Sequence, residues 1–159
     1  MALELTQIFE RSPELTSELE KVAQPGDTPE IIVHRAREII GGLREPELVA
    51  TLNAHPRIGD DVRALSELSL REQGGDQDPA TIAELGGLND AYEKQFGFRF
   101  VVFVNGRTKA QIIPVLRERL SRTRESELRA GIEEFLAISL DRLQRTNLKL
   151  AARAKDRGS

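Results

Sequence analysis

The feature that most constrains the fold is a start signal for helices that recurs along the chain. At three places a Ser, Thr or Asp stands directly before a proline: Ser12-Pro13, Thr28-Pro29 and Asp78-Pro79. Side chains of these types cap the first N–H groups of a helix, and proline fits the first turn because it has no N–H to leave unpaired. With 159 residues the chain can also bury a substantial core. The sequence therefore predicts several helices packed together.

Apolar residues recur at steps of three or four over long parts of the chain, as they do along one face of a helix. These runs cover residues 31–43, 82–96 and about 126–150. Glu45, Pro46 and Glu47 open a shorter helix that points into the segment around His55. Thr108 and Gln111 have the spacing of a capping box, and Pro114 behind them predicts a kink or a later helix start.

One segment, Phe100–Val104, departs from the helical pattern. Its aromatic and β-branched residues stand between Gly97 and the pair Asn105-Gly106, which on propensity alone predicts a strand. A single strand would have no partner in a helical protein. We therefore expect an all-α, single-domain multi-helix bundle spanning residues 1–159, with an irregular or extended segment near residues 97–107 and about ten frayed residues at the C-terminal end.

Composition excludes several classes of function. The absence of cysteine rules out disulfides, thiol nucleophiles and thiolate zinc sites. A net charge of -3 with acids and bases interspersed gives no dense basic patch for nucleic acid. The start of the chain lacks the pattern of a secretory signal, and no apolar run approaches the roughly 20 residues that span a bilayer. We expect a cytoplasmic protein that contacts neither nucleic acid nor membrane.

Only two residues, His34 and His55, can supply imidazole chemistry. His34 lies inside an expected helix beside Arg35 and Arg37, which favours a solvated or partly packed helix residue. His55 precedes a proline, which biases its backbone toward extended geometry just past a helix end. It is either a loop residue that bonds the backbone or a group that exchanges a proton near neutral pH. The sequence leaves both interpretations open.

The segment Ser69–Gln73 also allows two interpretations. Ser69 and Glu72 have the spacing of a capping box, which would be purely structural. If Glu72 instead lies beside His55, its carboxylate would stabilise the protonated ring and fix its orientation. Ser69 and Gln73 would then offer neutral hydrogen bonds to a polar ligand.

Four short blocks follow one another in an order that points to a known family. They are Phe9 with Ser12 and Pro13; His55 and Pro56 with Gly59; Ser69 with Glu72 and Gln73; and Leu88, Asn89 and Tyr92 followed by Phe96, Gly97, Phe98 and Phe100. With these blocks the chain resembles the 2-oxo-4-hydroxy-4-carboxy-5-ureidoimidazoline (OHCU) decarboxylase family of uric acid degradation over nearly its whole length.

The resemblance implies a cofactor-independent decarboxylase that converts OHCU to (S)-allantoin and CO2, with neither a metal nor an organic cofactor. His55 would be the catalytic proton donor, with Glu72 working beside it. The resemblance also implies a homodimer. The implied substrate-binding residues are Pro56, Ser69, Leu70, Arg71, Glu72, Gln73, Phe100, Val101, Val102, Phe103, Val104 and Arg142. Phe100–Val104 would contact the substrate largely through its backbone.

Arg142 has a second interpretation as a solvated charge on the last helix. It lies seven residues after Phe135, near the apolar face, where a guanidinium would need an anion. Three residues depart from the family pattern: Glu14 stands where a tryptophan is common, Arg99 replaces a common proline, and Gln95 stands where a basic residue is frequent. Two alternatives stay open. One is a non-catalytic helical interaction module, in which the His-Pro turn is structural and Arg142 lies on the surface; the other, which Arg99 keeps open, is a related enzyme acting on another ureido or imidazoline acid.

Overall fold

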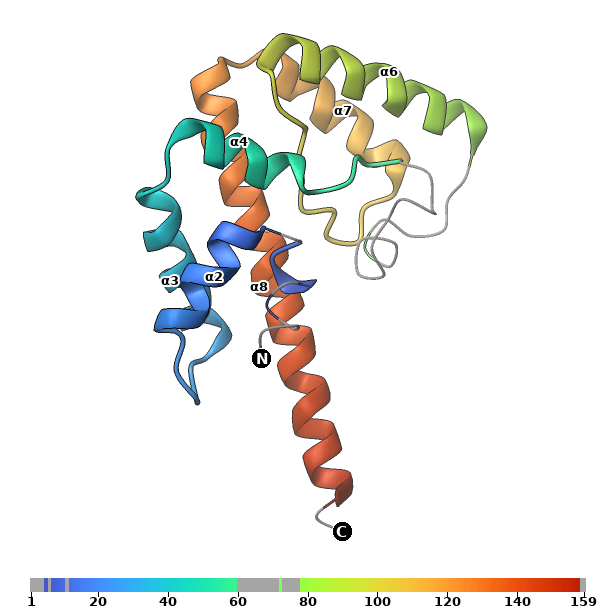
Figure 1. Ribbon diagram of the computed structural model, residues 1–159. Coiled ribbons are helices and arrows are strands. Elements are labelled where there is room, and N and C mark those ends of the chain that lie inside the picture. The colour runs from blue at the N-terminus through green and yellow to red at the C-terminus, as the bar shows by residue number, and fades with distance from the viewer. Residues whose placement is uncertain (1–4, 6, 11, 60–71, 73–77, 158–159) are drawn as a thin grey trace. The chain divides into compact units, whose positions relative to one another are not determined.

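The computed structural model describes residues 5, 7–10, 12–59, 72 and 78–157, with side chains up to residue 146. Its helices are α2 (Pro13–Val22), α3 (Pro29–Gly41), α4 (Glu45–Asn53), α6 (Pro79–Phe96), α7 (Lys109–Leu120) and α8 (Arg124–Arg157) (Figure 1). None of the described residues forms a strand. The predicted all-α class is confirmed.

Three of the helix starts use the caps that the sequence indicates. Thr28 and Asp78 accept hydrogen bonds from backbone N–H groups three residues on, at 3.2 and 3.1 Å. Thr108 and Gln111 form both bonds of the capping box, so α7 begins at Lys109 and Pro114 lies inside it. Ser12 precedes α2 but makes no capping bond with its side chain.

The last helix is longer than its apolar pattern predicts. It runs from Arg124 to Arg157, whereas the pattern ends near Leu150. Within the described part of the chain, no helix combines the length and apolar character that crossing a membrane requires.

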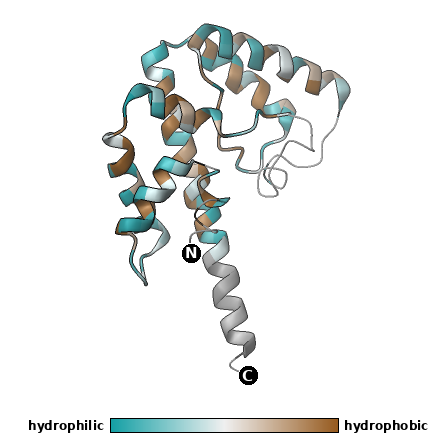
Figure 2. Ribbon diagram, viewed as in Figure 1, coloured by the Kyte–Doolittle hydropathy of each residue, from teal (hydrophilic) through white to brown (hydrophobic). Residues whose placement is uncertain are grey.

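The chain divides into two compact units, and α8 contributes to both. Unit 1 consists of residues 1–43 and 136–159, and unit 2 of residues 44–135. In unit 1, α2 packs against α3. Both helices carry hydrophilic and hydrophobic residues on different sides, as amphipathic helices do (Figure 2). Their buried apolar residues include Leu15, Leu19, Ile32, Ala36 and Ile40.

Unit 2 is built around an aromatic cluster on α6. The Tyr92 ring lies 4.6 Å from the ring centroid of Phe96, 6.0 Å from Phe98 and 5.3 Å from Phe100. All four rings are almost fully buried, and α6 packs on α7. The cluster joins the end of α6 to the segment that follows it.

The segment after α6 is neither helix nor strand over residues 99–104. Gly97 ends α6 in the left-handed conformation, with φ of 81°. The segment closes with a turn at Asn105 and Gly106, whose φ values of 50° and 77° are also left-handed. An extended, irregular stretch is thus what the chain forms, as predicted.

Candidate functional site

His55 lies in unit 2, just after the end of α4. Its N–H donates to the Leu52 carbonyl at 3.1 Å. Only 5% of the residue is exposed, and its ring meets the Phe135 ring edge-on, with the centroids 5.2 Å apart. The imidazole is therefore enclosed by the protein and lies edge-on against Phe135.

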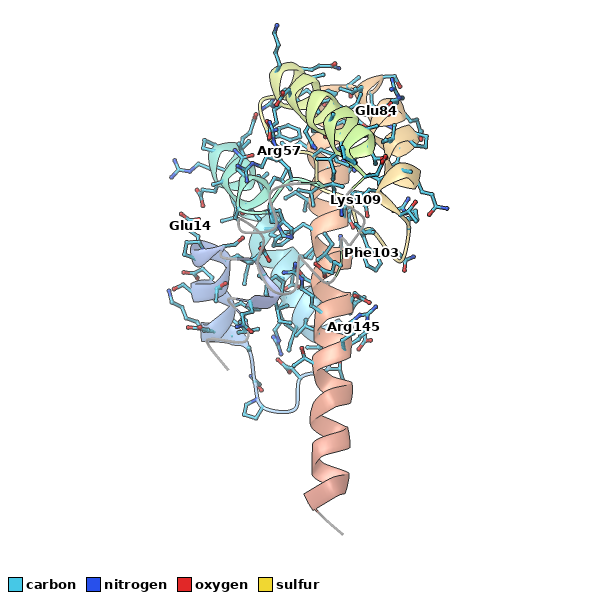
Figure 3. The ribbon with its side chains drawn as sticks, turned by 90° about the vertical axis from the view of Figure 1, so that its right-hand side faces the viewer. Glu14, Arg57, Glu84, Phe103, Lys109 and Arg145 are labelled. Carbon is cyan, nitrogen blue, oxygen red and sulfur yellow. The ribbon has the colours of Figure 1, made fainter. Side chains whose placement is uncertain are left out.

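The turn after His55 is attached to α6 by side chains. Asn89, which is 1% exposed, donates to the Ile58 carbonyl at 3.1 Å. Arg57, labelled in Figure 3, donates from Nε to Glu93 at 3.1 Å and from Nη2 to Asp90 at 2.7 Å. These hydrogen bonds, first of all the one to Glu93, raise the pKa of Arg57, so the guanidinium stays charged.

The same turn ends at Gly59, in a conformation that few other residues adopt. Its φ is +83°, in the left-handed region. A Cβ at this position would also come 3.4 Å from Cδ1 of Leu85. Pro56, between His55 and Gly59, is partly exposed. Glycine therefore has a physical reason to follow the His-Pro pair.

Arg99 connects the extended segment to the His55 turn. Its Nη1 donates to the carbonyl of His55 at 2.9 Å and to that of Asn53 at 3.0 Å. Its backbone N–H donates to Oδ1 of Asn53 at 2.9 Å. The residue that departs from the family pattern thus binds the backbone of the candidate catalytic residue.

Arginine side chains also hold the extended segment itself. Arg119 donates to the Val101 carbonyl at 2.8 Å, and Arg107 to the carbonyls of Phe103 and Val104 at 2.6 and 3.0 Å. Buried backbone groups must find hydrogen-bond partners. Since no described residue forms a strand beside this segment, guanidinium groups supply hydrogen bonds to its carbonyls.

Arg119 belongs to a buried polar network that the sequence did not indicate. Its Nε donates to Oε1 of Glu127 at 2.7 Å, and the Tyr92 hydroxyl donates to the same oxygen at 2.7 Å. Its guanidinium also lies 4.6 Å from the centroid of the Phe100 ring. Burial, and then the hydrogen bond to Glu127, raise the pKa of Tyr92 and keep its hydroxyl protonated.

Glu134 is a second acid beside the extended segment. Burial raises the pKa of its carboxyl, although the positive charges of Arg119 and Arg107 and a hydrogen bond with the Phe103 backbone act in the opposite direction. Because desolvation dominates, the charged form of Glu134 is disfavoured in the folded protein. No sequence pattern had singled out this residue.

Arg142 lies in unit 1 and is 2% exposed, so it is not the solvated charge that its helix position alone suggests. Its Nη1 donates to Oε2 of Glu10 at 2.7 Å and to the carbonyls of Gln7 and Ile8 at 2.9 and 3.3 Å. Glu10, 3% exposed, supplies an anion for the guanidinium from within the chain. A substrate-binding role for Arg142 stays a prediction.

The other sequence candidates fall as follows. Phe100–Val104 lies in unit 2 with His55 and Pro56. Ser69, Leu70, Arg71 and Gln73 lie outside the described residues, and Glu72 is described as a partly exposed helical residue, so their roles stay predictions. Over the described ranges, no group of three or more His, Asp or Glu side chains could hold a metal ion.

His34 behaves as its sequence context predicts. It is well exposed on α3, and its Nε2 lies 3.0 Å from Oε1 of Glu38, four residues on. This leaves His55 as the histidine with an enclosed ring.

Comparison with known proteins gives consistent matches. The OHCU decarboxylase family model matches residues 2–144. The uric acid degradation bifunctional protein of Bacillus sp. (strain TB-90) is 28% identical over 145 residues, which cover 86% of this chain and 28% of that protein. The 2-oxo-4-hydroxy-4-carboxy-5-ureidoimidazoline decarboxylase of Haloferax volcanii is 23% identical over 140 residues, covering 86% and 83%. The chain thus spans less than a third of the bifunctional relative and most of the second protein.

Two solved structures share the fold. A crystal structure of OHCU decarboxylase in the presence of (S)-allantoin superposes with a TM-score of 0.74 at 23% identity, covering 90% of this chain and 96% of that one. A crystal structure of (S)-allantoin synthase gives a TM-score of 0.69 at 24% identity, covering 91% and 48%.

Proposed function

The chain belongs to the OHCU decarboxylase family, and on that premise we propose that it decarboxylates OHCU to (S)-allantoin and CO2 without a cofactor. The observation that carries the proposal is the fixed geometry of His55 within the matched residues 2–144. The name of the Haloferax volcanii relative and the (S)-allantoin in the neighbouring crystal structure support the same substrate and product.

The reaction makes modest demands on the protein. In OHCU the departing carboxylate sits on a carbon next to a C=N bond. When the carbon–carbon bond breaks, its electron pair forms a C=C bond to the carbon of that C=N group, whose nitrogen takes up the displaced pair and a proton. The former C=N carbon is then protonated, and the hydroxyl loses its proton to become the carbonyl of (S)-allantoin. The substrate therefore supplies its own electron sink, and the enzyme has to orient the ring, hold the anion and deliver the proton to one face.

In this proposal His55 moves the proton. Imidazole gives or takes a proton near neutral pH, and here its orientation is held by Phe135 and its backbone by Leu52 and Arg99. A proton donor held in one direction protonates one face of a planar intermediate. That constraint would account for a single stereoisomer of the product.

The remaining candidates complete the proposal. Glu72 would stabilise the protonated form of His55, and residues 69–73 with Pro56 would line the substrate. Phe100–Val104 would contact the substrate through its backbone. Hydrogen bonds from arginine side chains to three of its carbonyls hold that backbone in place. Arg142 would bind a substrate anion in competition with Glu10.

Oligomeric state and location follow from the family by inference. The family resemblance supports a homodimer, and the cytoplasm is the expected compartment. Light scattering of the purified chain measures the first directly, because a dimer doubles the mass of 17.8 kDa.

The decisive experiment compares two histidine variants. His55→Asn should lower the rate of (S)-allantoin formation by about 10²- to 10⁴-fold, the contribution typical of a general acid or base. His34→Asn is the matched control, since His34 is exposed on α3 and should leave the rate unchanged. The product is followed by its optical activity, and circular dichroism checks the fold. Near-normal stereospecific turnover by His55→Asn would exclude His55 as the proton donor.

A further inference from the structure

Arg99 occupies an unusual position for a partly exposed arginine. Its side chain is 38% exposed, yet one nitrogen, Nη1, donates to two backbone carbonyls, those of Asn53 and His55. Its Nε also lies 3.6 Å from Oε1 of Glu93. The side chain thus spans the gap between the end of α4 and the C-terminal half of α6.

The two carbonyls are groups that the helix cannot satisfy. The last four carbonyls of a helix have no partner within it, and Asn53 is the last residue of α4, while His55 lies two residues beyond it. The residue after His55 is Pro56, which has no N–H to contribute to a local turn. A guanidinium at this place supplies donors and puts a positive charge at the negative end of the helix.

Glu93 couples this contact to the far side of the turn. The same carboxylate binds Arg57, two residues after His55, and lies beside Arg99. The His55 backbone is thereby held on both sides, at its own carbonyl by Arg99 and at residue 57 through Glu93. A shift of His55 along the turn would lengthen these hydrogen bonds.

We infer that Arg99 is a positioning residue, which fixes the backbone of His55 through the carbonyls of Asn53 and His55 and so sets where the imidazole delivers its proton. This inference rests on the proposed function for its catalytic meaning. Its structural half, that Arg99 holds the turn, is measurable without any substrate.

The test uses Arg99→Met, which keeps the apolar stem and removes the donors. A displacement of about 1 Å from productive geometry can cost about 100-fold in rate, so we expect kcat to fall by about 10- to 100-fold while KM changes less than about threefold. Arg99→Lys, which restores a charged donor one bond short, should recover part of the lost kcat. A variant that merely loosens the fold would lower the melting temperature without this split between kcat and KM.

Arg124→Met is the matched control. Arg124 is similarly exposed, at 46%, and also donates to a carbonyl at a helix end, that of Phe96 at 2.9 Å. Its other contacts, with Glu45 at the start of α4 and with the Phe98 ring, lie outside residues 53–58. Hydrogen–deuterium exchange of the peptide spanning residues 53–58 should rise in Arg99→Met and stay unchanged in Arg124→Met. Should Arg99→Met prove too unstable, Arg99→Leu, which also lacks donors, carries the same comparison.

The outcomes separate the two proposals. Unchanged kcat and exchange in Arg99→Met, or an equal loss of kcat in Arg124→Met, would overturn the positioning role. An inactive wild-type chain would instead refute the proposed function. Exchange at residues 53–58 would then still decide whether Arg99 holds the turn.

Discussion

In unit 2, α8 contacts α4 through Gly131 and Leu52. This contact decides whether a larger residue at position 131 raises or lowers the free energy of unfolding. Gly131 lies inside α8, and a Cβ there would come 3.1 Å from Cδ1 and 3.3 Å from Cδ2 of Leu52. Alanine is favoured over glycine in a helix interior by about 1 kcal/mol. Overpacking a tight core typically costs about 1–3 kcal/mol, and Leu52 is fully buried. We expect Gly131→Ala to lower the free energy of unfolding by about 1 kcal/mol.

The assay is urea unfolding followed by circular dichroism, with a control in a neighbouring helix. Gly87 lies in α6, and a Cβ there would meet nothing within 4 Å, so Gly87→Ala should stabilise by up to about 1 kcal/mol. Leu52→Ala alone should cost about 2–5 kcal/mol. In that background Gly131→Ala should become stabilising, because the atoms it would strike are gone.

The refuting result is equally specific. If Gly131→Ala stabilises the wild-type chain as much as Gly87→Ala does, then α8 does not press on Leu52 as the geometry requires. If Gly131→Ala destabilises the Leu52→Ala background by the same amount as the wild type, its cost has another cause. The Leu52 carbonyl also accepts the His55 N–H. The change in unfolding free energy caused by Gly131→Ala therefore also reports on packing at the end of α4, next to His55.

Two further predictions concern ionisable groups, the partly buried Glu134 and the buried Tyr92. The folded pKa of Glu134 is raised above its ordinary value, so ionising this carboxyl costs stability as the pH rises through the interval between the two values. Glu134→Gln should therefore raise the melting temperature at pH 8, with the gain shrinking toward pH 4; a gain independent of pH would contradict this assignment. Tyr92→Phe removes a donor to the charged carboxylate of Glu127 and should cost about 1.5–3 kcal/mol in urea unfolding, whereas a loss under about 0.5 kcal/mol would mean that the bond contributes little.

Local signals predicted the helices well because caps and apolar periodicity act over a few residues. Thr28, Asp78 and Thr108 each bond an N–H three positions away. The apolar pattern predicts that the last helix ends near Leu150, which is wrong, because α8 continues to Arg157. Charged residues with good helix propensity extend a helix after its apolar pattern stops. Local rules set where a helix begins more firmly than where it ends.

Charged residues could not be placed from sequence in the same way. Arg119 and Glu127 look like surface charges on two different helices, yet they are 4% and 0% exposed and paired with each other. Arg142 pairs with Glu10, which lies 132 positions earlier in the chain. A buried ion pair depends on a partner brought close by tertiary packing, and no periodicity in either helix encodes that partner.

In unit 2, arginine side chains bind the carbonyls of the His55 turn and of the extended segment. These bonds explain how a helical fold can include a candidate site built on irregular backbone. A segment with strand propensity but no neighbouring strand has carbonyl groups to satisfy, and guanidinium groups supply several donors in fixed directions. Arg99, Arg107 and Arg119 donate to five carbonyls between them, at residues 53, 55, 101, 103 and 104. Because these bonds belong to side chains, a single substitution can move the His55 turn or the extended segment without unfolding a helix.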